Sequence, residues 1–573
     1  MSAPEPVLRV ANLNVSFSGT PVVRGVSFTV NPGECLAVVG ESGSGKSVTA
    51  RSLLGLAGPG SLVRAGTLDV AGHDARNLSQ RRWRALRGKQ VGFILQDALT
   101  SLDPLRTVGK EIDDALRVHS KGTGAERAAR VIELLHAVGL DDPVRRASQR
   151  SGELSGGMRQ RALIASAIAL NPALIIADEP TTALDATIAA SVMNLLGRLR
   201  QAGSGMLLIS HDLAAVARVA DSIAVMQSGH IVEHGPREQV LNDPQHPYTR
   251  ALLAAVPAGK PRFTRLSPAR DAPTPSNSQP GRPAAPNGQP AAVVQPLLSA
   301  RGLAKTFPLA KTAGFRAVGN VGFDLLPGRT LGVVGESGSG KTTTARMALG
   351  LLTPDTGTVK LFGEQWSSIP ESARRTRRSS LGAIYQDPLS SFDPRLSAGA
   401  MLADALSLGA TRNPRAHAAE ITDLLQMVGL DVEMAARHPA TLSGGQRQRL
   451  AIARALAPKP RVLICDEPVS ALDVSIQAQV LDLLDELQRR LGLSYLFISH
   501  DLSVVRHMSD EVLVMRAGEV VESGATEAVF TNPVHEYTRT LLAAAPVLPP
   551  VRRVSLDAML AGHPEAGKIE RQP

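Results

Sequence analysis

The sequence predicts an α/β fold that is built twice in one chain, and two observations carry this prediction. Short aliphatic runs such as CLAVVG at Cys35–Gly40 alternate with longer segments of helical periodicity, a pattern typical of a mostly parallel sheet covered by helices. Several segments also recur in the same order 288 to 295 residues later. A period of that length indicates a duplicated domain, because solenoid repeats are only about 20–50 residues long.

The duplication sets the expected domain boundaries. GESGSGKS returns as GESGSGKT, ADEPTTALD returns as CDEPVSALD, and LLISHDL returns as LFISHDL. We expect a first domain at residues 1–256, a linker at 257–296, a second domain at 297–548 and a flexible tail at 549–573. The linker is rich in Pro, Gly, Ser, Ala and Asn, so we expect it to bury too little apolar surface to become ordered.

One part of the first domain departs from the alternation of strands and helices. Between Gln96 and Ser155 the pattern is helical, and ERAARVIELLHAVGL carries apolar residues at three- and four-residue steps. We therefore expect a helical subdomain inserted into the α/β core.

The composition limits the class of protein. A chain of 573 residues with 43% hydrophobic and 20% charged residues can bury large cores. Its two cysteines, Cys35 and Cys465, exclude a disulfide framework and are expected to be core residues. Without a long apolar span or a signal peptide, the protein is expected to be soluble or bound to a membrane from outside. The net charge of +10 fits phosphate ligands, nucleic acid or an anionic membrane, but 3% aromatic residues argue against base stacking.

The two glycine-rich segments predict phosphate-binding loops. Each matches the pattern G-x-x-x-x-G-K-[ST], follows a strand-like run and precedes a helical pattern. Glycines let backbone N–H groups turn toward phosphate oxygens, the lysine adds a full charge, and the last hydroxyl can bind Mg²⁺. The expected ATP-binding residues are Gly40, Glu41, Ser42, Gly43, Ser44, Gly45, Lys46 and Ser47, and Gly335, Glu336, Ser337, Gly338, Ser339, Gly340, Lys341 and Thr342.

Polar side chains follow neighbouring apolar strands, at the edge where α/β folds bind ligands. Asp178 ends a buried-type strand and can hold Mg²⁺, and the adjacent Glu179 can act as a general base toward water. Gln96 can bind Mg²⁺ and the water, and His211 can reach the γ-phosphate. The corresponding residues of the second domain are Gln386 and Asp466 for Mg²⁺, and Glu467 and His500 for catalysis.

The repeated LSGG segments predict a second kind of anion site. Ser155, Gly156 and Gly157 precede a helical run, so their N–H groups and the serine hydroxyl are available at a helix N-terminus. Such a site is useful if it closes on the nucleotide held by the other domain, which predicts a head-to-tail pairing of the two halves. The expected cap residues are Ser155, Gly156, Gly157 and Met158 in one half, and Ser443, Gly444, Gly445 and Gln446 in the other.

Together these segments resemble the ATP-binding cassette (ABC) ATPases, with Walker A, Q-loop, signature, Walker B, D-loop and H-switch in order. The resemblance covers residues 6–256 and 297–547. It implies an antiparallel β subdomain in each half and a surface at each Q-loop that receives a helix of a membrane subunit. It also implies that Phe17 and Phe307 stack on adenine, and that Asp185 and Asp473 belong to D-loops that cross between the halves.

TSLDP, SSFDP and NDPQHPYTRALLAAVP resemble the oligopeptide/dipeptide importer branch of this family. The resemblance implies ATP and Mg²⁺ as cofactors, two membrane permease subunits and an extracytoplasmic solute-binding protein as partners, and a place on the cytoplasmic face of the membrane. Because no cysteine follows either HPYT-like segment, we expect no iron–sulfur cluster. Met158 stands where the second signature has glutamine, so the two ATP sites are hypothesised to be unequal.

The sequence leaves two other functions open. A tandem cassette protein acting on ribosomes or DNA would carry the same motifs, but the proline-rich linker and the two cysteines disfavour it, so no nucleic-acid partner is expected. A scaffold that does not hydrolyse ATP is disfavoured because both glutamates and both histidines are present. The HPYT-like segments either gate a movement or only pack a C-terminal helix.

Overall fold

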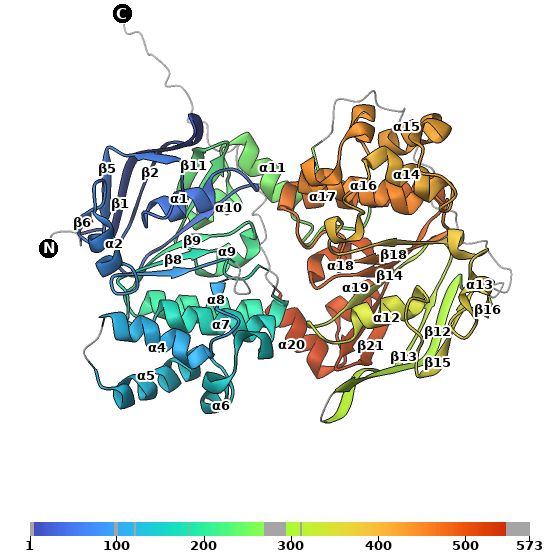
Figure 1. Ribbon diagram of the computed structural model, residues 1–573, viewed down its shortest axis with the longest axis horizontal. Coiled ribbons are helices and arrows are strands. Elements are labelled where there is room, and N and C mark those ends of the chain that lie inside the picture. Colours follow the sequence, from blue (N-terminus) through green and yellow to red (C-terminus); the bar gives the residue numbers. More distant parts are fainter. Residues whose placement is uncertain are drawn as a thin grey trace, which may run out of the picture.

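The computed structural model describes residues 5–96, 101–119, 122–182, 184–268, 294–309 and 312–545. The chain forms two α/β halves that lie next to each other, the N-terminal half in blue to green and the C-terminal half in yellow to red (Figure 1). The predicted tail, most of the predicted linker and Ala183 of the first D-loop lie outside the described residues.

A six-stranded sheet forms the core of the first half. Its order is β11-β10-β3-β9-β8-β7, and all neighbouring strands are parallel except the β10/β11 pair. The central strands are wholly buried because helices cover one face and an antiparallel sheet with two further helices packs on the other, which explains their continuous aliphatic runs. The strands are β3 (Cys35–Val39), β7 (Val91–Ile94), β8 (Leu174–Asp178), β9 (Gly205–Ile209), β10 (Ser222–Gln227) and β11 (His230–Pro236).

An antiparallel sheet packs beside this core. It has the order β2-β1-β5-β6, with β4 also paired to β1. Its strands are β1 (Leu8–Phe17), β2 (Thr20–Val30), β4 (Ser61–Arg64), β5 (Thr67–Val70) and β6 (His73–Asp74). The remaining helices of the α/β part are α1 (Lys46–Ser52), α2 (Gln80–Leu86), α8 (Ala186–Gln201), α9 (Leu213–Val219), α10 (Arg237–Asn242) and α11 (Pro247–Ala255).

The helical subdomain lies where the sequence pattern places it. Apolar side chains at helical spacing, such as Ile112, Leu134 and Leu135, are buried in one cluster with the sheet. A capping box at Thr123 fixes the start of the longest of these helices. The helices are α4 (Val108–His119), α5 (Gly124–Ala137), α6 (Pro143–Ser148) and α7 (Gly156–Ala167).

The second half repeats this architecture, but its sheets differ in two respects, and the first is that no strand among its described residues corresponds to β4. A bridge between Asn320 and Glu519 joins the antiparallel and parallel parts into one ten-stranded sheet, in the order β16-β15-β12-β13-β21-β20-β14-β19-β18-β17. The strands are β12 (Leu298–Leu309), β13 (Thr312–Leu325), β14 (Thr330–Val334), β15 (Thr356–Leu361), β16 (Glu364–Gln365), β17 (Leu381–Ile384), β18 (Val462–Asp466), β19 (Ser494–Ile498), β20 (Glu511–Arg516) and β21 (Glu519–Ala525). The helices are α12 (Lys341–Ala348), α13 (Glu371–Arg374), α14 (Ala398–Leu406), α15 (Ala418–Met427), α16 (Gly444–Leu456), α17 (Val474–Leu491), α18 (Leu502–Met508), α19 (Thr526–Thr531) and α20 (Glu536–Ala544).

The two halves face each other in opposite orientations. In Figure 1 the signature helix α7 of the first half lies at the level of α12, which follows the phosphate loop of the second half, and α16 lies at the level of α1. Helices join the halves where α11 packs on α17 and where α20 packs on α8.

The first part of the predicted linker is ordered, which corrects the expectation for residues 257–268. Arg262 forms an ion pair with Asp510 of the second half, and Leu266 is buried in the second half's core. The amide groups of Leu266 and Ser267 donate hydrogen bonds of 2.9 and 2.8 Å to the carboxylate of Asp482. The composition of the segment did not reveal this docking, because a few specific contacts, rather than a broad apolar surface, hold it.

The two cysteines are free and fully buried in β3 and β18, as the sequence predicted. Burial raises the pKa of Cys35 to about 12 and raises that of Cys465 further. Neither thiol is therefore a reactive thiolate near neutral pH. Among the described helices, none combines the length and the apolarity that a membrane crossing requires.

Candidate functional site

The two glycine-rich segments form loops between a buried strand and a helix. In the first half the loop joins β3 to α1, and Gly45 has φ +102°, a backbone conformation that favours glycine. Lys46 Nζ donates hydrogen bonds of 2.8 and 2.7 Å to the carbonyl oxygens of Gly40 and Glu41. Burial lowers the pKa of Lys46, and the carboxylates around it, Glu179 first among them, oppose this shift. Lysine and loop amides together form a positive cradle of the kind that binds phosphate.

Oxygen ligands for a divalent cation lie beside each loop. Ser47 Oγ donates a 2.8 Å hydrogen bond to Asp178 Oδ1, and Thr342 Oγ1 donates one of 3.2 Å to Asp466 Oδ1. Asp178 is fully buried, and its second oxygen, Oδ2, has no hydrogen-bond partner among the described residues. Burial raises the pKa of Asp178 in this arrangement. A buried, unpartnered carboxylate oxygen next to a hydroxyl fits the hard oxygen donors that Mg²⁺ prefers.

The glutamate after each of these aspartates is held in a strained conformation by several polar contacts. Glu179 has φ +49° and Glu467 has φ +51°, the left-handed region that non-glycine residues rarely adopt. Gln96 Nε2 and Thr182 Oγ1 donate hydrogen bonds of 2.9 and 3.0 Å to Glu179 Oε2. His211 Nδ1 lies 3.3 Å from Glu179 Oε1. Such strain is typical of functional sites, where the surrounding structure fixes a side chain in place.

Glutamate and histidine shift each other's protonation. Burial tends to raise the pKa of Glu179, but the hydrogen bond and charge of His211 outweigh it and hold this pKa below its ordinary value. Burial tends to lower the pKa of His211, and the contact with Glu179 reverses this and raises it. Glu179 is therefore ionised at neutral pH and can accept a proton from water.

The second half reproduces this constellation. Gln386 Nε2 donates a 2.8 Å hydrogen bond to Glu467 Oε2, and His500 Nδ1 lies 3.3 Å from the same oxygen. Ser470 occupies the position of Thr182, but its Oγ donates a 3.2 Å hydrogen bond to the backbone oxygen of Glu467. Burial tends to raise the pKa of Glu467, but the hydrogen bond and charge of His500, with smaller effects of Lys341 and Ser470, outweigh it and hold this pKa below its ordinary value. Sequence reasoning missed Thr182 and Ser470, although their recurrence next to the Walker B acids was a usable signal.

Each D-loop reaches the phosphate loop of the other half. Ser337 N donates a 3.4 Å hydrogen bond to Asp185 Oδ2, and the charge of Asp473 acts on Lys46. A cavity of about 500 Å³ extends along this junction. It is lined by Leu184 and Asp185 of the first half and, from the second half, by Lys341, Gln386, Glu467, Gly444 and His500, among others.

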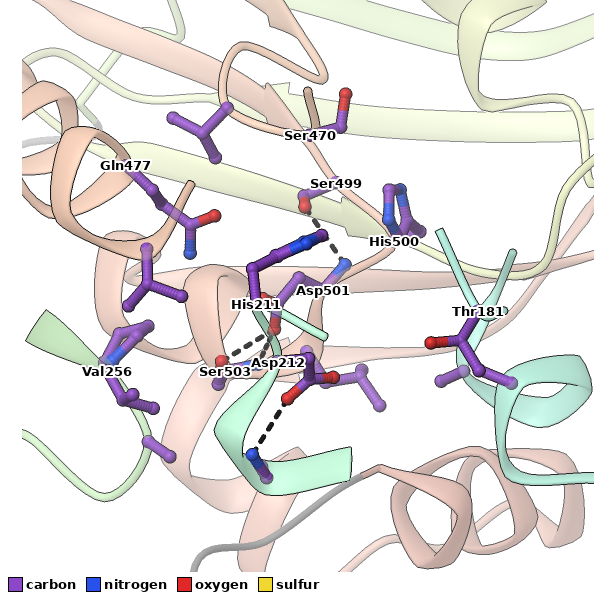
Figure 2. A pocket seen from close by; sticks show the side chains of 18 of the residues that line it. Thr181, His211, Asp212, Val256, Ser470, Gln477, Ser499, His500, Asp501 and Ser503 are labelled. Atoms are coloured by element: carbon purple, nitrogen blue, oxygen red, sulfur yellow. Dashed lines mark hydrogen bonds between the residues drawn. The ribbon is translucent and has the colours of Figure 1, made fainter. Parts of the chain in front are cut away.

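A smaller cavity of about 180 Å³ lies between the two halves, where their H-switch segments meet. Figure 2 shows His211 and Asp212 of one half beside His500 and Asp501 of the other. Asp212 is held by the amide groups of Ala214 and Ala215, at 2.9 and 3.0 Å. The histidines of both sites thus share one interface.

The two signature segments begin their helices differently. Ser443 Oγ accepts from Gln446 N at 3.3 Å, and Ser443 N donates to Gln446 Oε1 at 3.0 Å, which completes a capping box. In the first half Ser155 Oγ accepts from Met158 N at 3.4 Å, and methionine offers no oxygen for the return bond. The closure of each signature on the opposite phosphate loop stays a prediction, which the opposed orientation of the halves favours.

The two expected adenine-stacking residues differ in their surroundings. Phe17 pairs with Thr20 and Ser61 in the antiparallel sheet and packs at the edge of the core. Phe307 is 38% exposed and pairs across the strands with Phe315, which is 51% exposed. Phe315, which the sequence pattern did not single out, lies in a hairpin that is longer than the corresponding hairpin of the first half.

Comparison with known protein families gives two matches, each found twice. A family described as ABC transporter matches residues 23–182 and 318–470. A family described as oligopeptide/dipeptide transporter, C-terminal region, matches residues 232–283 and 521–570. Both matches therefore follow the duplication of the chain.

Curated relatives resemble the chain over nearly its full length. The oligopeptide transport ATP-binding protein OppD of Mycobacterium tuberculosis is 41% identical, over 96% of this chain and 100% of the relative. The glutathione import ATP-binding protein GsiA of Escherichia coli is 43% identical, over 96% and 90%. The peptidoglycan transport ATP-binding protein YejF of Agrobacterium fabrum is 44% identical, over 94% and 96%. Among solved structures, the archaeal ribosome recycling factor aABCE1 matches with a TM-score of 0.56 and 21% identity, over 87% of this chain and 86% of that one, and shows a shared fold.

Proposed function

Because the chain belongs to the family of ABC transporter ATP-binding proteins, we propose that it is the ATP-hydrolysing subunit of an importer for peptides or a related solute. One observation carries the substrate class: the oligopeptide/dipeptide C-terminal region follows both ATPase cores. The relatives named above transport oligopeptides, glutathione and peptidoglycan by their names, so the solute belongs to this range.

Each ATP lies between the phosphate loop of one half and the signature of the other in this proposal. The loop amides and Lys46 bind the phosphates, and Ser443 with its two glycines caps the γ-phosphate from the opposite side. Phe17 stacks on the adenine. The reverse pairing joins Lys341 to Ser155. The hydrogen bond between Asp185 of the first D-loop and Ser337 of the second half's phosphate loop supports this arrangement.

Hydrolysis follows from the ionised glutamate. Glu179 accepts a proton from the water that attacks the γ-phosphorus, and the bond to the β,γ-bridging oxygen breaks to give ADP and phosphate. Gln96 orients the carboxylate through its 2.9 Å hydrogen bond, and His211 holds it ionised. Glu467, Gln386 and His500 act in the same way at the second site.

Mg²⁺ fits the oxygen set beside each loop. Ser47 and Asp178 would hold it in the first site, with Gln96 nearby, and Thr342, Asp466 and Gln386 would do so in the second. When bound, the ion would neutralise charge on the β- and γ-phosphates.

The partners follow from the proposed transport cycle. We place the protein on the cytoplasmic face of the membrane, bound to two permease subunits that supply the pathway, with an extracytoplasmic binding protein delivering the solute. ATP closes the halves, and loss of phosphate releases them. The Q-loops at Gln96 and Gln386 transmit this movement to the permeases.

The ATPase assignment is tested by removing both phosphate-loop lysines. Lys46→Ala together with Lys341→Ala should reduce ATP hydrolysis to the background of the assay, and unchanged hydrolysis would contradict the assignment. The transport assignment is tested by purifying the protein with its membrane partners. Co-purified permeases, and a binding protein that native mass spectrometry detects with its bound solute, would support transport. Co-purified ribosomal RNA would instead favour a tandem cassette protein that acts on ribosomes.

A further inference from the structure

The HPYT-like segments begin helices whose first turn is fixed to the sheet. In the first half, Glu233 accepts hydrogen bonds from Gln245 N at 2.7 Å and His246 N at 3.1 Å. His246 Nδ1 in turn accepts from Tyr248 N at 3.2 Å and caps α11. Glu522, His535 and Tyr537 repeat these contacts at the start of α20. The tyrosine is therefore held in a defined position in both halves.

The tyrosine hydroxyl contacts the start of the phosphate loop. Glu41 N donates a 3.1 Å hydrogen bond to Tyr248 Oη. The same peptide unit presents the carbonyl of Gly40 to Lys46 Nζ at 2.8 Å. One peptide plane is thus held on its N–H side by the tyrosine and on its C=O side by the Walker A lysine.

The second half shows the same arrangement with independent residues. Glu336 N donates a 3.2 Å hydrogen bond to Tyr537 Oη, and Lys341 Nζ donates one of 2.7 Å to Gly335 O. The segment reads HPYT in one half and HEYT in the other, so the tyrosine and not the proline is common to both.

The same helices also contact the opposite half. α11 packs on α17, which Asp473 of the D-loop caps at its N-terminus, and α20 packs on α8, which Asp185 caps. Burial raises the pKa of Tyr248 to about 12, and the charges of Glu41 and Asp473 add to it. Each tyrosine hydroxyl therefore contacts the phosphate loop of its own half, while the helix that carries the tyrosine packs on the helix that follows the D-loop of the other half.

We propose that Tyr248 and Tyr537 are positioning residues for ATP binding. Each fixes the first peptide of its phosphate loop, and with it the resting place of the Walker A lysine, relative to the D-loop helix of the opposite half. This inference rests on the proposed role of the two phosphate loops in ATP binding.

The test measures the affinity for Mg-ATP at one site at a time. In a Lys341→Ala background, Tyr248→Phe keeps the ring and removes only the hydroxyl. We expect a loss of about fivefold in affinity, because one net hydrogen bond contributes about 1 kcal/mol. Tyr537→Phe in a Lys46→Ala background should give the same loss. In steady state, the loss should raise KM for ATP and leave kcat nearly unchanged.

Tyr495→Phe is the matched control, because the Tyr495 hydroxyl also bonds a backbone group, Leu484 O at 2.8 Å, but lies in the core of the second half. In the Lys341→Ala background it should leave the affinity unchanged. An unchanged affinity in Tyr248→Phe, or an equal loss in Tyr495→Phe, would overturn the inference. A Lys46→Ala Lys341→Ala protein that still binds ATP would instead refute the proposed role of the loops.

Discussion

Arg262 offers the sharpest test of how the chain joins its two halves. The chain leaves the first half just after α11, and the Arg262 side chain inserts between Asp510, Thr330 and Gln488 of the second half. In the first half the equivalent aspartate is Asp221, which pairs instead with Arg200 of helix α8 in the same half, at 2.7 Å. Gln488 occupies the position of Arg200 in the second half, so the connecting segment supplies the arginine that this half lacks.

The contacts of Arg262 set the expected size of the effect. Its side chain is 14% exposed and that of Asp510 is 18% exposed, and it donates hydrogen bonds of 2.9 Å to Thr330 and 2.7 Å to Gln488. Arg329 still pairs with Asp510 at 3.0 Å. Arg262→Ala should therefore lower the free energy of unfolding of the second half by about 3 kcal/mol, near the lower end of the range for breaking a buried ion pair. For a domain of this size that corresponds to roughly 6–12 °C in Tm.

Differential scanning calorimetry without nucleotide would measure this effect on the unfolding of the second half. Arg265→Ala is the matched control, because Arg265 lies in the same segment but is exposed, and its one hydrogen bond within the described part of the chain is to Pro268 O, at 3.4 Å. Adding Gln488→Arg to Arg262→Ala should restore most of the loss by recreating the pairing of the first half. Equal melting temperatures for Arg262→Ala and Arg265→Ala would refute the reasoning.

Three further predictions concern catalysis and pH. Glu179→Gln should lower ATP turnover more than Glu467→Gln, because the site of Glu179 faces the signature with the complete capping box; equal losses would contradict this. Met158→Gln should bring the turnover of the two single variants together in the same phosphate-release assay. Burial raises the pKa of Asp485 to about 7, above its value of about 3.9 in the unfolded chain. Between about pH 4 and 7 the folded protein therefore keeps a proton that the unfolded chain has lost, so the free energy of unfolding falls as the pH rises. Asp485→Asn should remove up to about 4 kcal/mol of this pH dependence, and parallel Tm–pH curves for the two proteins would refute it.

The sequence predicted the duplicated α/β fold and the inserted helical subdomain, both of which are confirmed. These features were accessible because they depend on local patterns: aliphatic runs for buried strands, helical periodicity, and glycines at turns. The residues of the candidate site were accessible for a related reason. Glu179 and His211 each follow a strand of the same parallel sheet, and adjacent parallel strands end at the same edge, which brings the two side chains together.

The tertiary structure alone decided which distant segments meet. Nothing in the local pattern around Tyr248 points to Glu41, 207 residues away, or pairs Arg262 with Asp510. The order of residues 257–268 likewise depends on a surface of the other half. The sequence by itself determined the chemistry of each motif, because that chemistry resides in a few consecutive residues. The alignment of those motifs depends on packing between elements far apart in the chain, which no local pattern encodes.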